Sequence, residues 1–97
     1  MAYRSGFVCA GVVALATVTT ALPALAQEVW SWSCDRLWQE RNQIYKDAGY
    51  CFKTARAIRY FGNAGCSYDR EGDVPLSSRD RAFVATITQV ERSKGCQ

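Results

Sequence analysis

The stretch SCDRLWQERNQIYKDAG, residues 33–49, decides the fold because it has the pattern of an amphipathic helix. Ser33 can cap the first turn, and Asp35 suits the positive end of the helix dipole. Positions spaced by three and four residues share one face of such a helix. On this face lie Cys34, Leu37, Trp38, Arg41, Ile44, Tyr45 and Ala48. Gly49 follows where helices commonly end in a left-handed residue, so the stretch predicts a helix from Ser33 to Ala48.

A shorter helix is predicted from Ala55 to Phe61, because Thr54 can act as its N-cap and Gly62 ends the run. We expect Ala57, Ile58 and Phe61 to face the same way. Seven residues are marginal as an isolated helix, so packing and flanking disulfide chemistry must hold this one.

A third helix is predicted after Pro75. It begins at Ser77-x-x-Asp80, which is a capping-box pattern with Asp in place of Glu, and it closes at Gly95. Its apolar stripe consists of Phe83, Ile87 and Val90. Turn-forming residues without periodicity fill the chain from Gly62 to Pro75, which predicts a long loop. The sequence therefore predicts an all-α fold, a small three-helix domain with a long loop between its second and third helices.

Residues 1–26 have the features of a cleaved secretory signal peptide. Arg4 supplies the positive charge, an apolar run extends from Phe7 to Val18, and Ala24-Leu25-Ala26 fits a signal-peptidase site. The apolar run is about 12 residues long, short of the roughly 20 that a membrane span needs. We therefore predict one domain over residues 27–97, a periplasmic or secreted location, and no stable membrane insertion after cleavage.

The cysteines predict two disulfides. Cys9 would leave with the signal peptide, and an even set remains: Cys34, Cys51, Cys66 and Cys96. A domain of about 70 residues has a thin core and commonly needs such staples once it is exported. A structural metal site is not expected, because the chain has no His and no Cys-x-x-Cys pair.

Four cysteines allow three pairings, and sequence alone cannot choose among them. The preferred one joins Cys34 to Cys96, linking the start of the first helix to the end of the third, and Cys51 to Cys66 around the short helix. The crossed pairing joins Cys34 to Cys66 and Cys51 to Cys96.

Charge and composition argue against several functions. The chain has 12 Lys and Arg against 9 Asp and Glu, with the signs interspersed, so no basic stripe suggests nucleic-acid binding. Without His, the usual Ser-His and Cys-His nucleophile pairs are excluded. Asp69, Glu71 and Asp73 are the carboxylates left for acid–base chemistry or calcium binding. We expect them to be solvated loop acids. A calcium site is not expected, because Val74 stands where a calcium loop needs Gly. No catalytic residue and no cofactor is predicted.

Arg41 is the strongest binding candidate, because an arginine on an apolar stripe is costly unless it is paired or reaches solvent. We expect it to tie the first helix to a loop acid or to backbone carbonyls, near Asp73 or Asp80. The functional alternative is a recessed anion or peptide-carboxylate site that Arg41 forms with Asn42 and Tyr45.

Two tryptophans, Trp30 and Trp32, precede the first helix and are expected to be half exposed. They could stack on a sugar ring or insert into a partner's groove, although such residues more often cover a small core. Trp38 is expected in the core.

The chain resembles the YARHG domain family from about Cys34 to Cys96. The resemblance is carried by residues 41–45 (RNQIY), Gly49, Phe52, Tyr60-Phe61, and Leu76-Ser77 with the following helix to Glu91. In the Tyr-Ala-Arg-His-Gly stretch that names the family, this chain keeps Tyr45 and Gly49. Asp47 and Ala48 replace the Arg and His, so no role of those two groups carries over.

The resemblance implies a small extracellular bacterial domain without an established molecular function. Together with the residues, it favours a monomeric, non-enzymatic binding module of the envelope, with a protein or a cell-wall glycan as partner. The alternatives are a secreted effector or inhibitor of an envelope enzyme, and a small carboxylate-dependent hydrolase.

Overall fold

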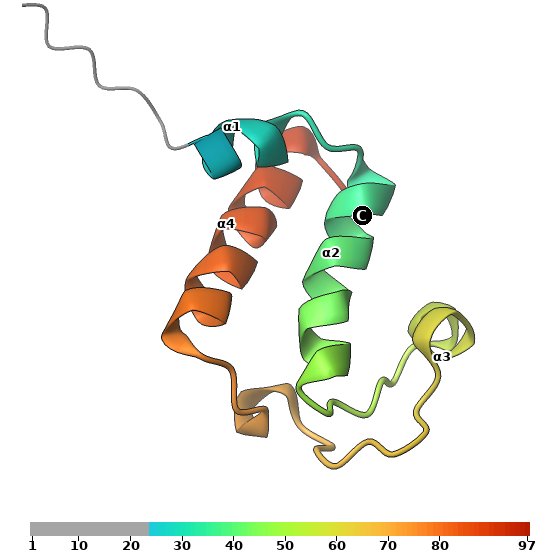
Figure 1. Cartoon of the computed structure of the whole chain (residues 1–97). Coiled ribbons are helices and arrows are strands. Elements are labelled where there is room, and N and C mark those ends of the chain that lie inside the picture. Colours follow the sequence, from blue (N-terminus) through green and yellow to red (C-terminus); the bar gives the residue numbers. More distant parts are fainter. Residues whose placement is uncertain (1–23) are drawn as a thin grey trace, which may run out of the picture.

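The computed structural model describes residues 24–97, and this part of the chain is all-α (Figure 1). Its elements, in order, are α1 (Ala24–Trp30), α2 (Cys34–Asp47), α3 (Ala55–Phe61), the 3₁₀ helix η3 (Glu71–Asp73) and α4 (Ser78–Lys94). Over the same residues the β-type pairing is one isolated parallel bridge, between Tyr50 and Tyr68. The predicted fold class is confirmed, with α1 and η3 added. The predicted signal peptide up to residue 23, Cys9 included, lies outside the described residues.

The helices begin and end at the predicted caps. The Ser33 hydroxyl accepts from the Arg36 amide, and the Ser77 hydroxyl accepts from the Asp80 amide at 3.0 Å. Thr54 caps α3 in the same way, and Gly95 ends α4 in the left-handed conformation, with φ of 72°. These boundaries follow from local sequence, because a side-chain oxygen satisfies amides that have no partner inside the helix.

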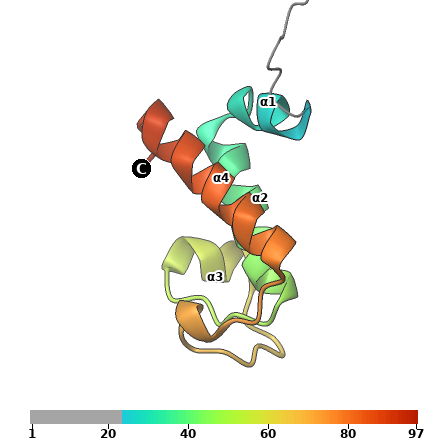
Figure 2. The ribbon, with the colours of Figure 1, turned by 90° about the vertical axis from the view of Figure 1, so that its left-hand side faces the viewer.

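The antiparallel helices α2 and α4 form the frame of the molecule, α1 crosses one end of this pair, and α3 lies beside α2 (Figures 1 and 2). The main core lies where α1 meets the pair. It consists of Val29, Trp32, Leu37, Ile87 and Val90. The α4 stripe predicted from sequence therefore faces this core.

Helix α1 changes the environment of Trp32, which is 7% exposed, so the expectation of half exposure is wrong for this residue. Its ring meets Phe83 edge-on, with centroids 6.3 Å apart, and the Arg36 guanidinium lies 4.3 Å from the ring centroid. Trp30 on α1 remains 43% exposed, as expected.

Lys94 of α4 fastens this N-terminal segment to the pair. Its ammonium donates to the carbonyl oxygens of Trp30 at 3.2 Å and Trp32 at 2.7 Å. A cation at the end of a helix satisfies carbonyls that lack an amide partner. Cleavage after Ala26 would remove three of the seven residues of α1, and the mature chain would still contain the fully buried Val29.

A second packing region lies between α2 and α3 and is aromatic. Phe52 and Phe61 stack with centroids 5.1 Å apart, and Trp38 lies 5.7 Å from Phe61. Trp38 is thus partly buried here and is not part of the main core. The Asn63 side chain accepts from the Phe52 amide at 2.7 Å and donates to the Phe52 carbonyl at 3.0 Å, which holds the loop in place.

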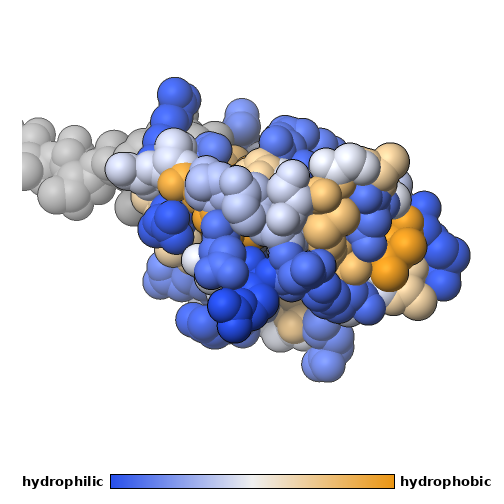
Figure 3. Space-filling view, turned by 90° about the horizontal axis from the view of Figure 1, so that it is seen from below, coloured by the Kyte–Doolittle hydropathy of each residue, from blue (hydrophilic) through white to orange (hydrophobic). Residues whose placement is uncertain are grey.

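Fewer residues of α3 face the interior than the sequence pattern predicted. Ala57 is buried, whereas Ile58 is 42% exposed, so its expected inward orientation is wrong. Successive helical residues are about 100° apart, and the short helix turns Ala57 and Phe61 inward together, which leaves Ile58 outside. Figure 3 shows apolar surface at the end of the molecule where α3 lies, with hydrophilic side chains around it.

Both disulfides of the preferred pairing are present. Cys34–Cys96 joins the first residue of α2 to the chain just after α4, with Cα atoms 5.5 Å apart, and Cys51–Cys66 closes the segment that contains α3. The crossed pairing is not formed. Two disulfides in so small a domain place it in an oxidising, extracytoplasmic environment. Among residues 24–97, no helix has the length and apolar character needed to cross a membrane.

Two isoleucines with different burial, Ile87 on α4 and Ile58 on α3, allow a matched test of this packing. Ile87→Ala should lower the free energy of unfolding by about 2–5 kcal/mol, because it leaves a cavity in the core. Ile58→Ala should cost under about 1 kcal/mol, because that side chain is already partly in water. Urea unfolding of oxidised protein measures both, and equal losses would contradict the described core.

Candidate functional site

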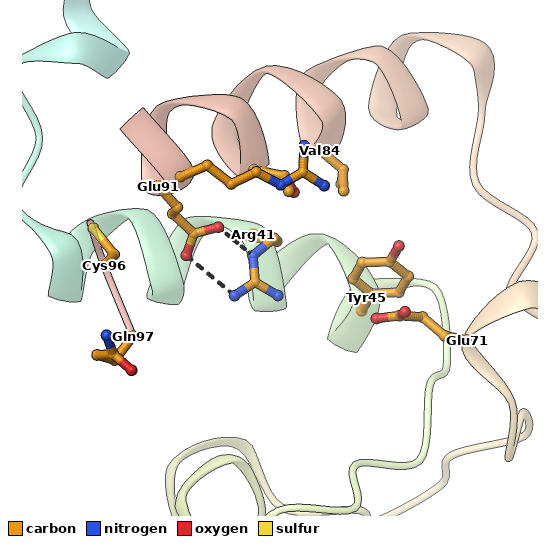
Figure 4. Close-up of a pocket in the computed structure, with 9 residues that line it drawn as sticks. Arg41, Tyr45, Glu71, Val84, Glu91, Cys96 and Gln97 are labelled. Carbon is orange, nitrogen blue, oxygen red and sulfur yellow. Dashed lines mark hydrogen bonds and ion pairs between the residues drawn. The ribbon is translucent and has the colours of Figure 1, made fainter. Parts of the chain in front are cut away.

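Arg41 is fixed on α2 by an ion pair with Glu91 of α4 (Figure 4). Its Nε lies 2.8 Å from one carboxylate oxygen of Glu91, and its second donor, Nη2, lies 3.1 Å from the other. The two side chains are 25% and 13% exposed. A bidentate, partly buried pair holds its geometry better than an exposed surface pair.

The expectation that Arg41 is paired is confirmed, but the expected partner is wrong. Asp73 pairs with Arg70 at 3.3 Å, and Asp80 lies about three turns before Glu91 on α4. Antiparallel packing of α2 against α4 brings the partner from 50 positions away in the sequence. No local pattern could have identified Glu91.

Two pockets meet at Arg41. The first, of about 330 Å³, lies between α2 and α4 and includes Tyr45, Glu91 and Arg92 in its lining. The second, of about 250 Å³, lies between α2 and the start of α3 and includes Trp38 and Asn42. Arg41 and Glu71 line both pockets, so the two adjoin along one face of α2. We call this surface the Arg41 groove, defined by Trp38, Arg41, Asn42, Tyr45 and Glu71.

The predicted trio of Arg41, Asn42 and Tyr45 is therefore divided between the two pockets. Asn42 lines the second pocket, Tyr45 lines the first, and Arg41 lies at their junction. The other two binding candidates, Trp30 and Trp32, line neither pocket. Trp38, expected in the core, lines the second pocket instead, and of the three loop acids Glu71 is the one that lines both pockets.

Polar groups in the groove retain hydrogen-bonding capacity. A guanidinium has five N–H donors, of which Arg41 gives two to Glu91. The Asn42 amide nitrogen donates to the Trp38 carbonyl at 2.9 Å, which leaves its amide oxygen as an acceptor. Among residues 24–97, Glu71 forms no ion pair. The groove thus offers both donors and acceptors to a ligand.

Glu71 differs from its neighbours in the loop. The side chains of Asp69 and Asp73 are 85% and 57% exposed and pair with Lys53 and Arg70, so they are solvated loop acids. Glu71 is exposed as well, but the 3₁₀ turn η3 places it in the lining of the groove beside Tyr45, as Figure 4 shows. Within the described part of the chain, no cluster of three or more potential metal ligands was found.

Tyr45 reports on this environment. Burial raises the pKa of its phenol above the ordinary value of 10.0, and the negative charge of Glu71 raises it further. The positive charges of Arg41 and Arg81 oppose this shift. Since burial, Glu71 and, to a smaller extent, Tyr50 all favour the neutral phenol, Tyr45 keeps its hydroxyl proton well above neutral pH.

A double-mutant cycle should show strong coupling between Arg41 and Glu91. Arg41→Met should cost about 2 kcal/mol of stability, because it leaves a partly buried carboxylate without its partner. The double variant Arg41→Met/Glu91→Met should be more stable than the sum of the single losses predicts, by about 1–2 kcal/mol. Urea unfolding at neutral pH measures the cycle, and additive losses would contradict a direct pair.

The pKa of Tyr45 should fall when Glu71 is neutralised. Glu71→Gln removes the second cause of the raised pKa, and ring-carbon NMR titration of labelled tyrosines measures the change. The raised pKa also makes the stability of the wild type depend on pH. The contribution of Tyr45 is complete below the unfolded-state pKa of 10.0 and is lost as the pH rises through the higher folded-state pKa. An unchanged or higher Tyr45 pKa in Glu71→Gln would contradict the placement of Glu71.

Comparison with known proteins gives one match. The sequence profile of the YARHG domain covers residues 11–92, which includes Arg41, Glu71 and Glu91 and extends further toward the N-terminus than the resemblance seen in the sequence. No curated protein and no solved structure matches the chain. Because the profile covers most of its length, the chain belongs to the YARHG domain family.

Proposed function

We propose that this chain is a non-enzymatic binding module of the bacterial envelope and that it takes its ligand in the Arg41 groove. One observation carries the proposal: the Arg41–Glu91 pair fixes a guanidinium where two pockets meet and leaves three of its N–H donors without a partner among residues 24–97. Few, fixed polar groups at the floor of a pocket are typical of a ligand site.

The location is part of this proposal. The two disulfides and the family support a domain outside the cytoplasm. We further propose that cleavage after Ala26 releases the domain as a monomer into the periplasm or the medium. The Arg41 groove would then face envelope components directly.

A binding role is favoured over hydrolysis. Glu71 and Glu91 line the same pocket, and two carboxylates about a substrate are what a carboxylate-dependent hydrolase needs. However, both oxygens of Glu91 accept hydrogen bonds from Arg41, so this carboxylate is engaged. The chain also has no His to act as a general base.

A concave site also favours binding over inhibition. An inhibitor that enters another protein's active site would present a protruding element, whereas the Arg41–Glu91 pair lines a concave pocket. The groove is suited to receive a ligand. The role of a secreted effector or inhibitor is therefore second to that of a binding module.

The test is cosedimentation of the exported, oxidised protein with purified peptidoglycan sacculi, with pull-down from solubilised envelope proteins as the parallel measurement. The variant Arg41→Met/Glu91→Met removes the guanidinium without leaving a lone charge. It should bind at least about tenfold more weakly, the effect expected when hydrogen bonds to a charged group are lost.

The matched control is Arg36→Met/Glu40→Met, which removes an exposed Arg–Glu pair from the same helix. This control should bind like the wild type. The proposal would be overturned if the protein bound neither the sacculi nor the solubilised envelope proteins with micromolar affinity. It would also be overturned if Arg41→Met/Glu91→Met bound as tightly as the wild type. Release of new reducing ends or peptides from the sacculi would overturn its non-enzymatic part.

A further inference from the structure

We infer that the ligand of the Arg41 groove is a short, neutral oligosaccharide. This inference rests on the proposed function and names its ligand class. Three features of the groove carry it: mixed donors and acceptors, balanced charge, and aromatic rings in the wall of the second pocket.

The polar groups match the chemistry of sugar hydroxyls, each of which both donates and accepts. Arg41 presents unused N–H donors, while the Asn42 amide oxygen and the Glu71 carboxylate are acceptors. The Tyr45 hydroxyl can do both, and its raised pKa keeps it protonated. A ligand with only donors or only acceptors would leave part of this set unsatisfied.

The charges that line the first pocket disfavour an ionic ligand, and the further cation of the second pocket, Lys53, is paired with Asp69 at 3.3 Å. In the first pocket, Glu71 and Glu91 would repel an anion, while Arg41 and Arg92 would repel a cation. Arg41 is already neutralised in place by Glu91. The anion or peptide-carboxylate site, which was the functional alternative for Arg41, therefore fits this structure less well than a neutral ligand does.

Aromatic rings form part of the second pocket's wall, and its lining includes Trp38, Tyr50 and Phe52. Phe52 is only 3% exposed and packs against Tyr50, with centroids 5.2 Å apart, while the Arg56 guanidinium lies 3.8 Å from the Trp38 ring centroid. The ring surface that remains open comes from the half-buried Tyr50 and Trp38. The C–H face of a sugar ring can pack against such a wall while its hydroxyls reach the polar groups. Since the two pockets adjoin at Arg41, an oligosaccharide of at least two sugar units would occupy both.

A peptide is the less suitable occupant. Extended peptides commonly bind by pairing their backbone with a strand edge. Over residues 24–97 the groove is walled by helices and loops, and the isolated bridge between Tyr50 and Tyr68 offers no strand for such pairing. The hydroxyls of an oligosaccharide can form their hydrogen bonds with the side chains of the groove and require no strand edge.

The experiment is isothermal titration calorimetry of the exported, oxidised protein with four probes. Two are neutral tetrasaccharides, chitotetraose and maltotetraose. The anionic probe is tetragalacturonate, and the peptide probe is acetyl-tetraalanine amide. At least one neutral tetrasaccharide should bind at a single site, and more tightly than the anionic and peptide probes.

Two variants test the groove directly. Asn42→Leu removes an acceptor and Glu71→Gln removes a charge, and each should weaken tetrasaccharide binding about tenfold or more. The controls are Gln43→Leu on the exposed side of α2 and Asp73→Asn on η3, which should bind like the wild type. Circular dichroism melts of all four variants establish that the folds are intact.

Binding of neither tetrasaccharide, tighter binding of the anion or the peptide, or unchanged affinity in both groove variants would overturn the inference. Failure of the inference remains distinguishable from failure of the proposed function. If the wild type is retained by envelope material, Arg41→Met/Glu91→Met is not, and the tetrasaccharides do not compete, then the module binds in the groove and only the ligand class is wrong.

Discussion

The contact between α2 and α4 is the interaction on which the rest of the structure depends. The Cys34–Cys96 disulfide fastens one end of this pair, and the Arg41–Glu91 ion pair crosses it further along. Leu37 and Ile87, both fully buried, fill the space between the helices. Since four of the five groove residues lie on α2, with Glu71 on η3 and with α4 on one side, the same contact builds both the core and much of the candidate site.

The position of the site follows from the way this small domain divides its packing. One face of α2 meets α4 and α1 in the main core, and a neighbouring face meets α3 in the aromatic region. Arg41 lies between these two regions, where neither set of apolar side chains covers it completely. A thin core thus leaves space for pockets, and the disulfides supply constraint that apolar burial alone would not.

Local features of the fold could be predicted from sequence, whereas contacts between distant segments could not. Ser33, Thr54 and Ser77 mark helix starts because capping acts within three residues. Arg41 was predicted to be paired because an unpaired cation on an apolar stripe is costly. Its pairing with Glu91 depends on how two helices pack. The burial of Trp32 depends on α1, which was not predicted because its first residues fall in the predicted signal peptide. Glu71 could not be told from Asp69 and Asp73, because only the turn at η3 separates their environments.

Disulfide mapping tests the central claim most directly, because the three possible pairings of the four cysteines imply different packing of α2 against α4. Tryptic digestion of exported protein without reductant separates all four cysteines into different peptides. The account predicts linked peptides that contain Cys34 with Cys96 and Cys51 with Cys66. Peptides that join Cys34 to Cys66 and Cys51 to Cys96 would contradict the α2–α4 frame and the groove built on it.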